Sequence, residues 1–271
     1  MISNKWFVTG GVVFFLMLAR LELQAQEAEP TPTPAGPGRE SLLSKVSFLR
    51  VWYIGGPQSP RITLSSEDGG GARKVLGSSM RPGRLGSYRL LKPDPMSVVT
   101  YAGSAIPNAE GKLENPGEPL AKSDSIPLRG GAFYTLVVRE ESGRFRVETV
   151  EDFPPEEGRG PSFRIFDFSN LESGGVTLST GGPAEKVWSV TEKSPFLKNF
   201  PGKSGPGRLE LIGPSQDKAM VLSAFEMDLS PQKSYSIVLF IDRYGQRVFG
   251  VTEDASVDYS EQDIKEFLKA Q

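Results

Sequence analysis

The chain carries two similar segments, and this internal repeat limits its possible folds more than any other feature. "LRVWYI" at 49–54 aligns with "FRIFDF" at 163–168. At the same offset, "ITLS" at 62–65 aligns with "VTLS" at 176–179. Two separate blocks that share one offset indicate duplication rather than chance, so we expect two homologous domains.

The later blocks of each unit repeat as well. "LRGGAFYTLVV" at 128–138 matches "LSPQKSYSIVL" at 229–239, which places Leu128 on Leu229 and Tyr134 on Tyr235. "GRFRVETVED" at 143–152 matches "GQRVFGVTED" at 245–254. The first unit is longer because of an excursion at 102–123, and surface connections tolerate such insertions at little cost. The two units therefore share a beginning, a middle and an end.

The repeated segments have the two-residue period of β-strands. In "FYTLVV" alternate residues fall on opposite faces, with Tyr134, Leu136 and Val138 on one and Phe133, Thr135 and Val137 on the other. About six or seven short strands in roughly 100 residues is typical of a β-sandwich. The predicted fold class is all-β, with two homologous immunoglobulin-like or transthyretin-like β-sandwich domains in tandem. A barrel with the same number of strands is the alternative.

The termini and the composition suggest boundaries for these domains. A polar start with one lysine, an apolar stretch at 6–19 and small Ala25 are typical of a secretory signal peptide. The predicted organisation is a signal peptide at 1–25, a proline-rich linker at 26–40, a first sandwich at 41–153, a linker at 154–161, a second sandwich at 162–256 and a C-terminal helix or tail at 257–271. Pieces 40–155 and 159–271 would then each unfold cooperatively. A signal kept as an N-terminal anchor is the alternative.

The last residues have the pattern of a short helix. Ser260 is suited to the N-cap with Asp263 three positions later, and Ile264, Phe267 and Leu268 share one helical face. We expect this helix to pack on the second sandwich.

The motifs resemble a known group of proteins. "LRGGAFYTLVV" and "VETVED" of the first unit are similar to the secreted bacterial repeats called domain of unknown function 4397, and in outline to the alginate O-acetylation accessory proteins. "LSPQKSYSIVLF" departs from that pattern because it lacks the glycine before the aromatic residue. The resemblance covers about residues 46–255 and implies a β-sandwich at the cell envelope that is not an enzyme.

The residue types that are missing exclude much chemistry. The chain has no histidine and no cysteine, so it lacks Ser-His and Cys-His pairs, imidazole proton transfer and ordinary zinc or copper sites. Disulfides and a lipid anchor on an N-terminal cysteine are excluded for the same reason. The net charge of −2 argues against nucleic acid as a partner. We expect no enzymatic activity, no cofactor and no metal.

Two motifs invite a functional interpretation that their context does not favour. "PGKSG" at 201–205 has Leu197 where a phosphate-binding loop needs glycine, and no helix pattern follows it. The acidic pairs at 151–152 and 253–254 recur at one repeat position, at the ends of the final strands. We expect these carboxylates to be solvated there.

One stretch of the first unit is strongly basic. Residues 69–92 contain six cations and no acid; the cations are Arg73, Lys74, Arg81, Arg84, Arg89 and Lys92. Such a cluster attracts polyanions such as envelope polysaccharides. The alternative is that these side chains only keep strand edges soluble.

These observations predict a secreted or periplasmic protein that acts as a non-catalytic binding or structural module at the cell envelope. Its partner would be an envelope polysaccharide or protein, with no membrane span once the signal is removed. An accessory subunit of a complex that modifies an exopolysaccharide is the alternative.

Overall fold

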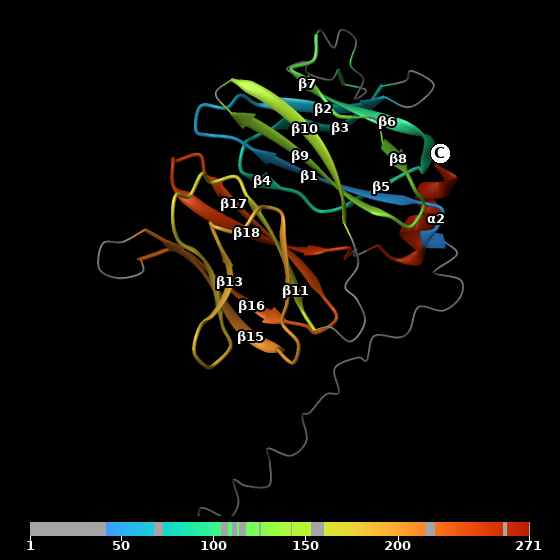
Figure 1. Ribbon diagram of the computed structural model, residues 1–271. Helices are drawn as coiled ribbons and strands as arrows, with labels where there is room; N and C mark the ends of the chain where they lie inside the picture. The colour runs from blue at the N-terminus through green and yellow to red at the C-terminus, as the bar shows by residue number, and fades with distance from the viewer. Residues whose placement is uncertain are drawn as a thin grey trace, which may run out of the picture. The chain divides into compact units, whose positions relative to one another are not determined.

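A computed structural model describes residues 42–270 with short gaps at 68–72, 104–107, 110–112, 114–117, 125, 142, 153–159, 215–219 and 257–258. The predicted signal peptide and proline-rich linker lie outside the described residues, as does most of the predicted linker at 154–161. In the described part of the chain, Figure 1 shows mainly β-strands, with a short helix near the C-terminus.

The first half of the chain forms two sheets. One has the order β10-β9-β1-β4, with β5 also paired to β1; its strands are β1 (Ser47–Ile54), β4 (Arg84–Leu85), β5 (Arg89–Leu91), β9 (Phe133–Glu141) and β10 (Arg144–Asp152). The other has the order β3-β2-β6-β7, with β8 paired to β6; its strands are β2 (Ile62–Glu67), β3 (Arg73–Met80), β6 (Asp94–Gly103), β7 (Ala121–Lys122) and β8 (Ile126–Leu128).

The second half repeats this topology. One sheet has the order β14-β11-β17-β18, with strands β11 (Ser162–Asp167), β14 (Phe196–Asn199), β17 (Ser234–Ile241) and β18 (Arg247–Asp254). The other has the order β13-β12-β15-β16, with strands β12 (Gly175–Ser179), β13 (Glu185–Ser189), β15 (Gly205–Gly213) and β16 (Met220–Leu229).

The strand registers confirm that the halves are equivalent. β1 and β9 run parallel with Arg50 opposite Thr135, and β11 and β17 run parallel with Arg164 opposite Ser236. The aligned tyrosines each face a glutamate of the next strand. The prediction of two homologous β-sandwiches in tandem is therefore confirmed.

Each sandwich has its own hydrophobic core, drawn from both of its sheets. In the first, Leu136 of β9 packs with Leu64 of β2, and both are fully buried. In the second, Ile237 of β17 packs with Leu178 of β12 around buried Trp188. Alternation along the strands supplies these inward side chains, as the sequence pattern predicts.

The opposite face of the central strands is buried too, against the other sandwich. Trp52 and Val137 of the first half form a cluster with Phe166, Val238 and Phe240 of the second. The rings of Trp52 and Phe166 meet edge to face with centroids 5.4 Å apart. Burial on both faces explains why these strands read as nearly continuous apolar runs.

The C-terminal helix α2 (Glu261–Lys269) has the predicted capping box of Ser260 and Asp263. Its position corrects the sequence-based expectation. Ile264, which is fully buried, packs in a cluster with Phe48 and Tyr88 of the first sandwich, and Figure 1 shows α2 beside β5. Periodicity identifies the apolar face of a helix but not the surface that covers it, so the choice of the second sandwich was wrong.

Candidate functional site

The basic stretch lies along a groove at one open edge of the first sandwich. β4 and β5 border it on one side and β3 on the other, and its volume is about 380 Å³. Leu49 and Val51 of β1 contribute to its lining together with Leu76 and Met80 of β3. Leu76 and Met80 are buried, so the exposed surface of the groove is more polar than apolar. We call this hollow the basic groove.

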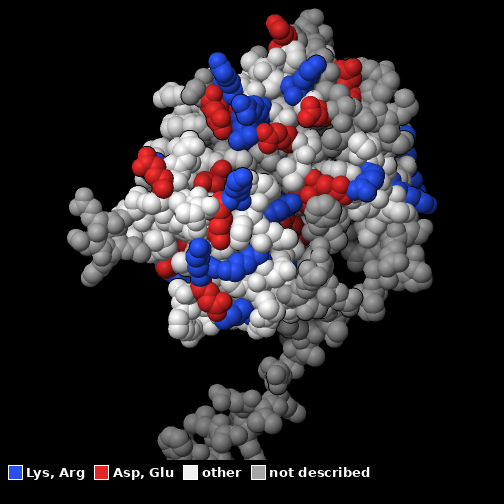
Figure 2. All heavy atoms as spheres, in the orientation of Figure 1, with Lys and Arg blue, Asp and Glu red and all other residues white. Residues whose placement is uncertain are grey.

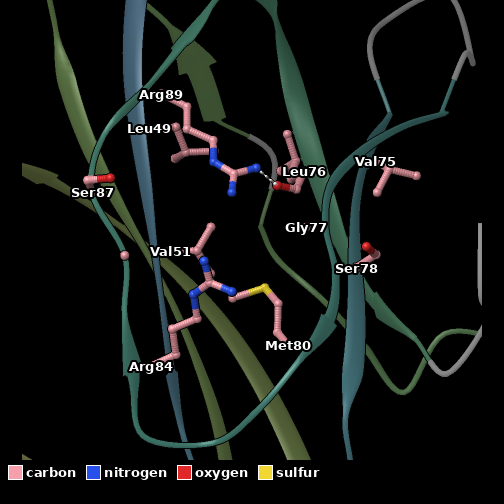
Figure 3. A pocket seen from close by; sticks show the side chains of 11 residues that line it. Leu49, Val51, Val75, Leu76, Gly77, Ser78, Met80, Arg84, Ser87 and Arg89 are labelled. Atoms are coloured by element: carbon pink, nitrogen blue, oxygen red, sulfur yellow. Dashed lines mark hydrogen bonds between the residues drawn. The ribbon is translucent and has the colours of Figure 1, made fainter. Parts of the chain in front are cut away.

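Two of the six predicted cations line the groove. Arg84 and Arg89 are exposed residues of β4 and β5, and Figure 3 shows both side chains reaching across toward β3. An Nη atom of Arg89 donates a hydrogen bond of 2.7 Å to the carbonyl oxygen of Leu76. Within the described part of the chain, neither arginine forms an ion pair.

The other four cations lie elsewhere. Arg81 and Lys92 are exposed and do not line the groove. Arg73 and Lys74 belong to β3, but their side chains lie outside the described part of the structure. The structure therefore brings together two members of the predicted cluster.

A one-residue bulge in the strand beside β1 shapes the groove. Leu85 lies opposite Trp52 and Arg89 opposite Leu49, so one extra residue is accommodated between β4 and β5. Gly86 lies just before the bulge and keeps the register of β4, donating from its backbone nitrogen to the carbonyl oxygen of Val51 at 2.9 Å. Ser87 and Tyr88 together then lie opposite Arg50. In the second sandwich the corresponding pair, β11 and β14, keeps one register throughout.

The extra residue also turns Tyr88 away from the groove and toward the second sandwich. The hydroxyl of Tyr88 donates to Asp152 at 2.8 Å and accepts from the backbone nitrogen of Ala255 at 3.2 Å. Burial raises the pKa of this phenol well above its usual value, so it is a neutral donor at physiological pH.

Asp152 belongs to a buried network of charges that joins the two sandwiches; we call it the central network, made of Arg50, Asp152, Arg164 and Asp254. Arg50 of the first sandwich donates to Asp254 of the second, and Arg164 of the second donates to Asp152 of the first. Each arginine also donates to the backbone carbonyl of the glutamate before that aspartate, at 3.0 and 3.2 Å. The exchange is reciprocal, so the repeat builds an interface with approximate two-fold symmetry.

Each sandwich orients its own half of the network. Thr135 accepts a hydrogen bond of 2.7 Å from Nε of Arg50 and donates to Asp152. Its repeat equivalent Ser236 accepts from Arg164 at 3.3 Å and donates to Asp254 at 2.7 Å. The alternation of the strands, which sends this face outward from each core, places all of these groups at one interface.

The network corrects the expectation that these acidic pairs are solvated. The side chains of Asp152 and Asp254 are 0% and 3% exposed, against 1% for Arg50 and 14% for Arg164. Burial raises the pKa of Asp254, while Arg50 and Arg164 act to lower it. The neighbouring Glu151 is more exposed and pairs with Arg129. A recurring Arg and a recurring Asp at matched repeat positions were the signal that could have revealed this pairing.

The other motifs considered in the sequence do not form a ligand site among the described residues. Residues 201–204 form a turn and irregular backbone before β15, with no helix to make a phosphate loop. The described residues contain no group of three acidic side chains that could hold a metal ion. Over most of the face in Figure 2, Lys and Arg are interspersed with Asp and Glu. None of the helices described is long and apolar enough to cross a bilayer.

Comparison with known proteins gives little further guidance. No known family matches the chain, and no curated protein matches it. A leucine-rich repeat protein from Bacteroides thetaiotaomicron VPI-5482 aligns at 13% identity over 71% of this chain and 26% of that one, with a TM-score of 0.19. A candidate cell adhesion protein from Bacteroides fragilis NCTC 9343 aligns at 10% identity over 74% of this chain and 85% of that one, with a TM-score of 0.23. At such TM-scores neither similarity carries an argument about this chain.

Proposed function

We propose that this chain is a secreted or periplasmic protein whose joined sandwiches form a non-catalytic binding module at the cell envelope. In this proposal the basic groove holds an anionic ligand. The observation that carries it is the position of Arg84 and Arg89, whose guanidinium groups reach into the groove without a carboxylate partner among the described residues.

The central network supports a role in binding rather than catalysis. Asp152, Asp254 and the two arginines are largely removed from solvent and form ion pairs with one another across the interface. A general acid or base must reach its substrate, whereas these groups hold one sandwich against the other. A fixed arrangement of two sandwiches presents the groove on a rigid support.

The experiment is binding of the chain from residue 26 onward to a panel of acidic and neutral polysaccharides at low and moderate salt. The test variant reverses two charges of the groove, Arg84→Glu and Arg89→Glu. The control makes the same change in net charge at Lys193 and Arg243, which are exposed on the second sandwich. Thermal melting of each variant checks that it is folded.

Binding of acidic polymers that weakens with salt and is lost only in the groove variant would support the proposal, because exposed charges are screened by salt. Equal loss in both variants would mean that net charge alone attracts the polymer. That result, or no binding to any member of the panel, would overturn the role assigned to the groove.

A further inference from the structure

The size of the basic groove limits what it can hold. Its volume of about 380 Å³ lies near the lower end of the roughly 300–1,000 Å³ typical of small-molecule pockets. Such a hollow encloses one ring with its substituents. A long polymer would instead need a continuous track of cations, and Arg81 and Lys92 lie outside the lining.

The chemistry of the lining limits the ligand further. Arg84 and Arg89 enter from the same side, one on each flank of the bulge. Arg89 commits one donor to Leu76, which holds its side chain across the groove, and a guanidinium has five N–H donors in a planar fork. The free donors suit the two oxygens of a carboxylate, which arginine binds in bidentate fashion.

The rest of the lining is mainly polar. The exposed hydroxyls of Ser78 and Ser87 stand at the rim. Val51 and Met80 lie beside Arg84 in Figure 3, but Met80 is buried and offers little surface to a ligand. The lining thus combines paired cationic donors with a few neutral polar groups and a small apolar area.

We propose that the groove binds a single compact organic carboxylate, about one ring in size, with its carboxylate on Arg84 and Arg89. The proposal rests on the proposed function and narrows its ligand class from anionic polymers in general to one carboxylated group. A polymer would then be held through one such group, by its end or by a single residue.

The test uses benzoate as probe and benzyl alcohol as its neutral match, measured by titration calorimetry and by chemical shift changes in the full chain from residue 26. We expect benzoate to bind at least about ten-fold more tightly than benzyl alcohol, as charge-assisted hydrogen bonds imply. Arg84→Gln should weaken benzoate by about the same factor. Equal binding of the two probes, or no binding of benzoate, would overturn the proposal.

A second variant separates shape from charge. Ser87→Trp places a large side chain at the rim without changing the charge, and Gln232→Trp makes the same change at an exposed turn of the second sandwich. We expect Ser87→Trp to abolish benzoate binding and Gln232→Trp to leave it unchanged. Benzoate binding that survives Ser87→Trp would contradict the location.

The two proposals fail in different ways. If acidic polysaccharides bind the chain, depend on Arg84 and Arg89, and are unaffected by Ser87→Trp, the one-carboxylate proposal is wrong and the proposed function stands. If the charge reversal at Arg84 and Arg89 leaves polymer binding intact, the groove is not the binding site and the proposed function is wrong on that point.

Discussion

Replacing Arg50 with methionine tests the central network directly. The arginine side chain is 1% exposed and donates to Thr135 of its own sandwich and to Thr252 and Asp254 of the other. Methionine keeps the length of the side chain and removes the charge, which leaves Asp254 buried with only Ser236 and the more distant Arg164.

Breaking a buried ion pair by removing one partner costs about 3–5 kcal/mol. That is a large fraction of the roughly 5–15 kcal/mol that stabilises a folded protein. For a chain of this size each kcal/mol lowers the melting temperature by about 2–4 °C, so we expect a fall of about 6–20 °C.

Urea unfolding and scanning calorimetry would measure this loss. Arg61→Met is the control, because Arg61 is exposed and its side chain donates a hydrogen bond of 3.2 Å to Ser79, which is exposed as well. We expect the control to change the free energy of unfolding by no more than about 0.5 kcal/mol. If Arg50→Met costs no more than the control, the network does not hold the sandwiches together.

The pH dependence gives an independent check. The pKa of Asp254 is raised in the folded protein, so its protonated form favours folding. This contribution is fully present below the unfolded pKa and is lost as pH rises through the folded pKa. Removing Arg50 takes away an interaction that lowers this pKa. The loss of unfolding free energy caused by Arg50→Met should therefore become smaller as the solution is acidified from neutral pH. A penalty that is constant or grows on acidification would refute the reasoning.

Three further outcomes follow from the geometry. Trp52→Phe should lower the free energy of unfolding in urea by about 1–3 kcal/mol, because the fully buried indole packs on Phe166 and on the Arg50 guanidinium and phenylalanine leaves part of that space empty. An unchanged free energy of unfolding would contradict this packing. Gly86→Ala should lower stability by about 1–3 kcal/mol, the usual cost of crowding a packed site, because a Cβ atom there would meet the carbonyl oxygen of Val51 at 3.0 Å. An unchanged melting temperature would contradict this close approach of the two backbones. The separate pieces 40–155 and 159–271 should fail to melt cooperatively as monomers in calorimetry. Each piece would expose its side of the Trp52–Phe166 cluster and leave its buried charges without their partners. Two sharp independent transitions would instead support the expectation drawn from the repeat alone.

The contact between the two sandwiches was not predictable from the sequence. The repeat predicts two equivalent sandwiches, but a repeat carries no information on whether its copies touch. Phe133, Thr135 and Val137 share one face of β9, and alternation does not show that the second sandwich packs against Val137 on that face. Because both faces of β9 are buried, the two copies form one folded unit.

The candidate site was likewise predictable only in part. The concentration of cations at 69–92 was visible in the sequence, yet of the four whose side chains the structure describes, Arg84 and Arg89 line the groove and Arg81 and Lys92 do not. The selection depends on the bulge between β4 and β5, which is a matter of pairing register. Register is set by contacts between strands far apart in the chain, so a local pattern does not reveal it.

The sequence by itself determined the local features of this protein: strands with a two-residue period, their duplication, and a capped helix at the C-terminus. Each depends on neighbours a few residues apart or on direct comparison of two segments. Only the tertiary structure decided that Arg50 meets Asp254 and that α2 packs on the first sandwich. These contacts join residues that are distant in the chain. They form only when the two sandwiches pack together and bring apolar faces and opposite charges into contact.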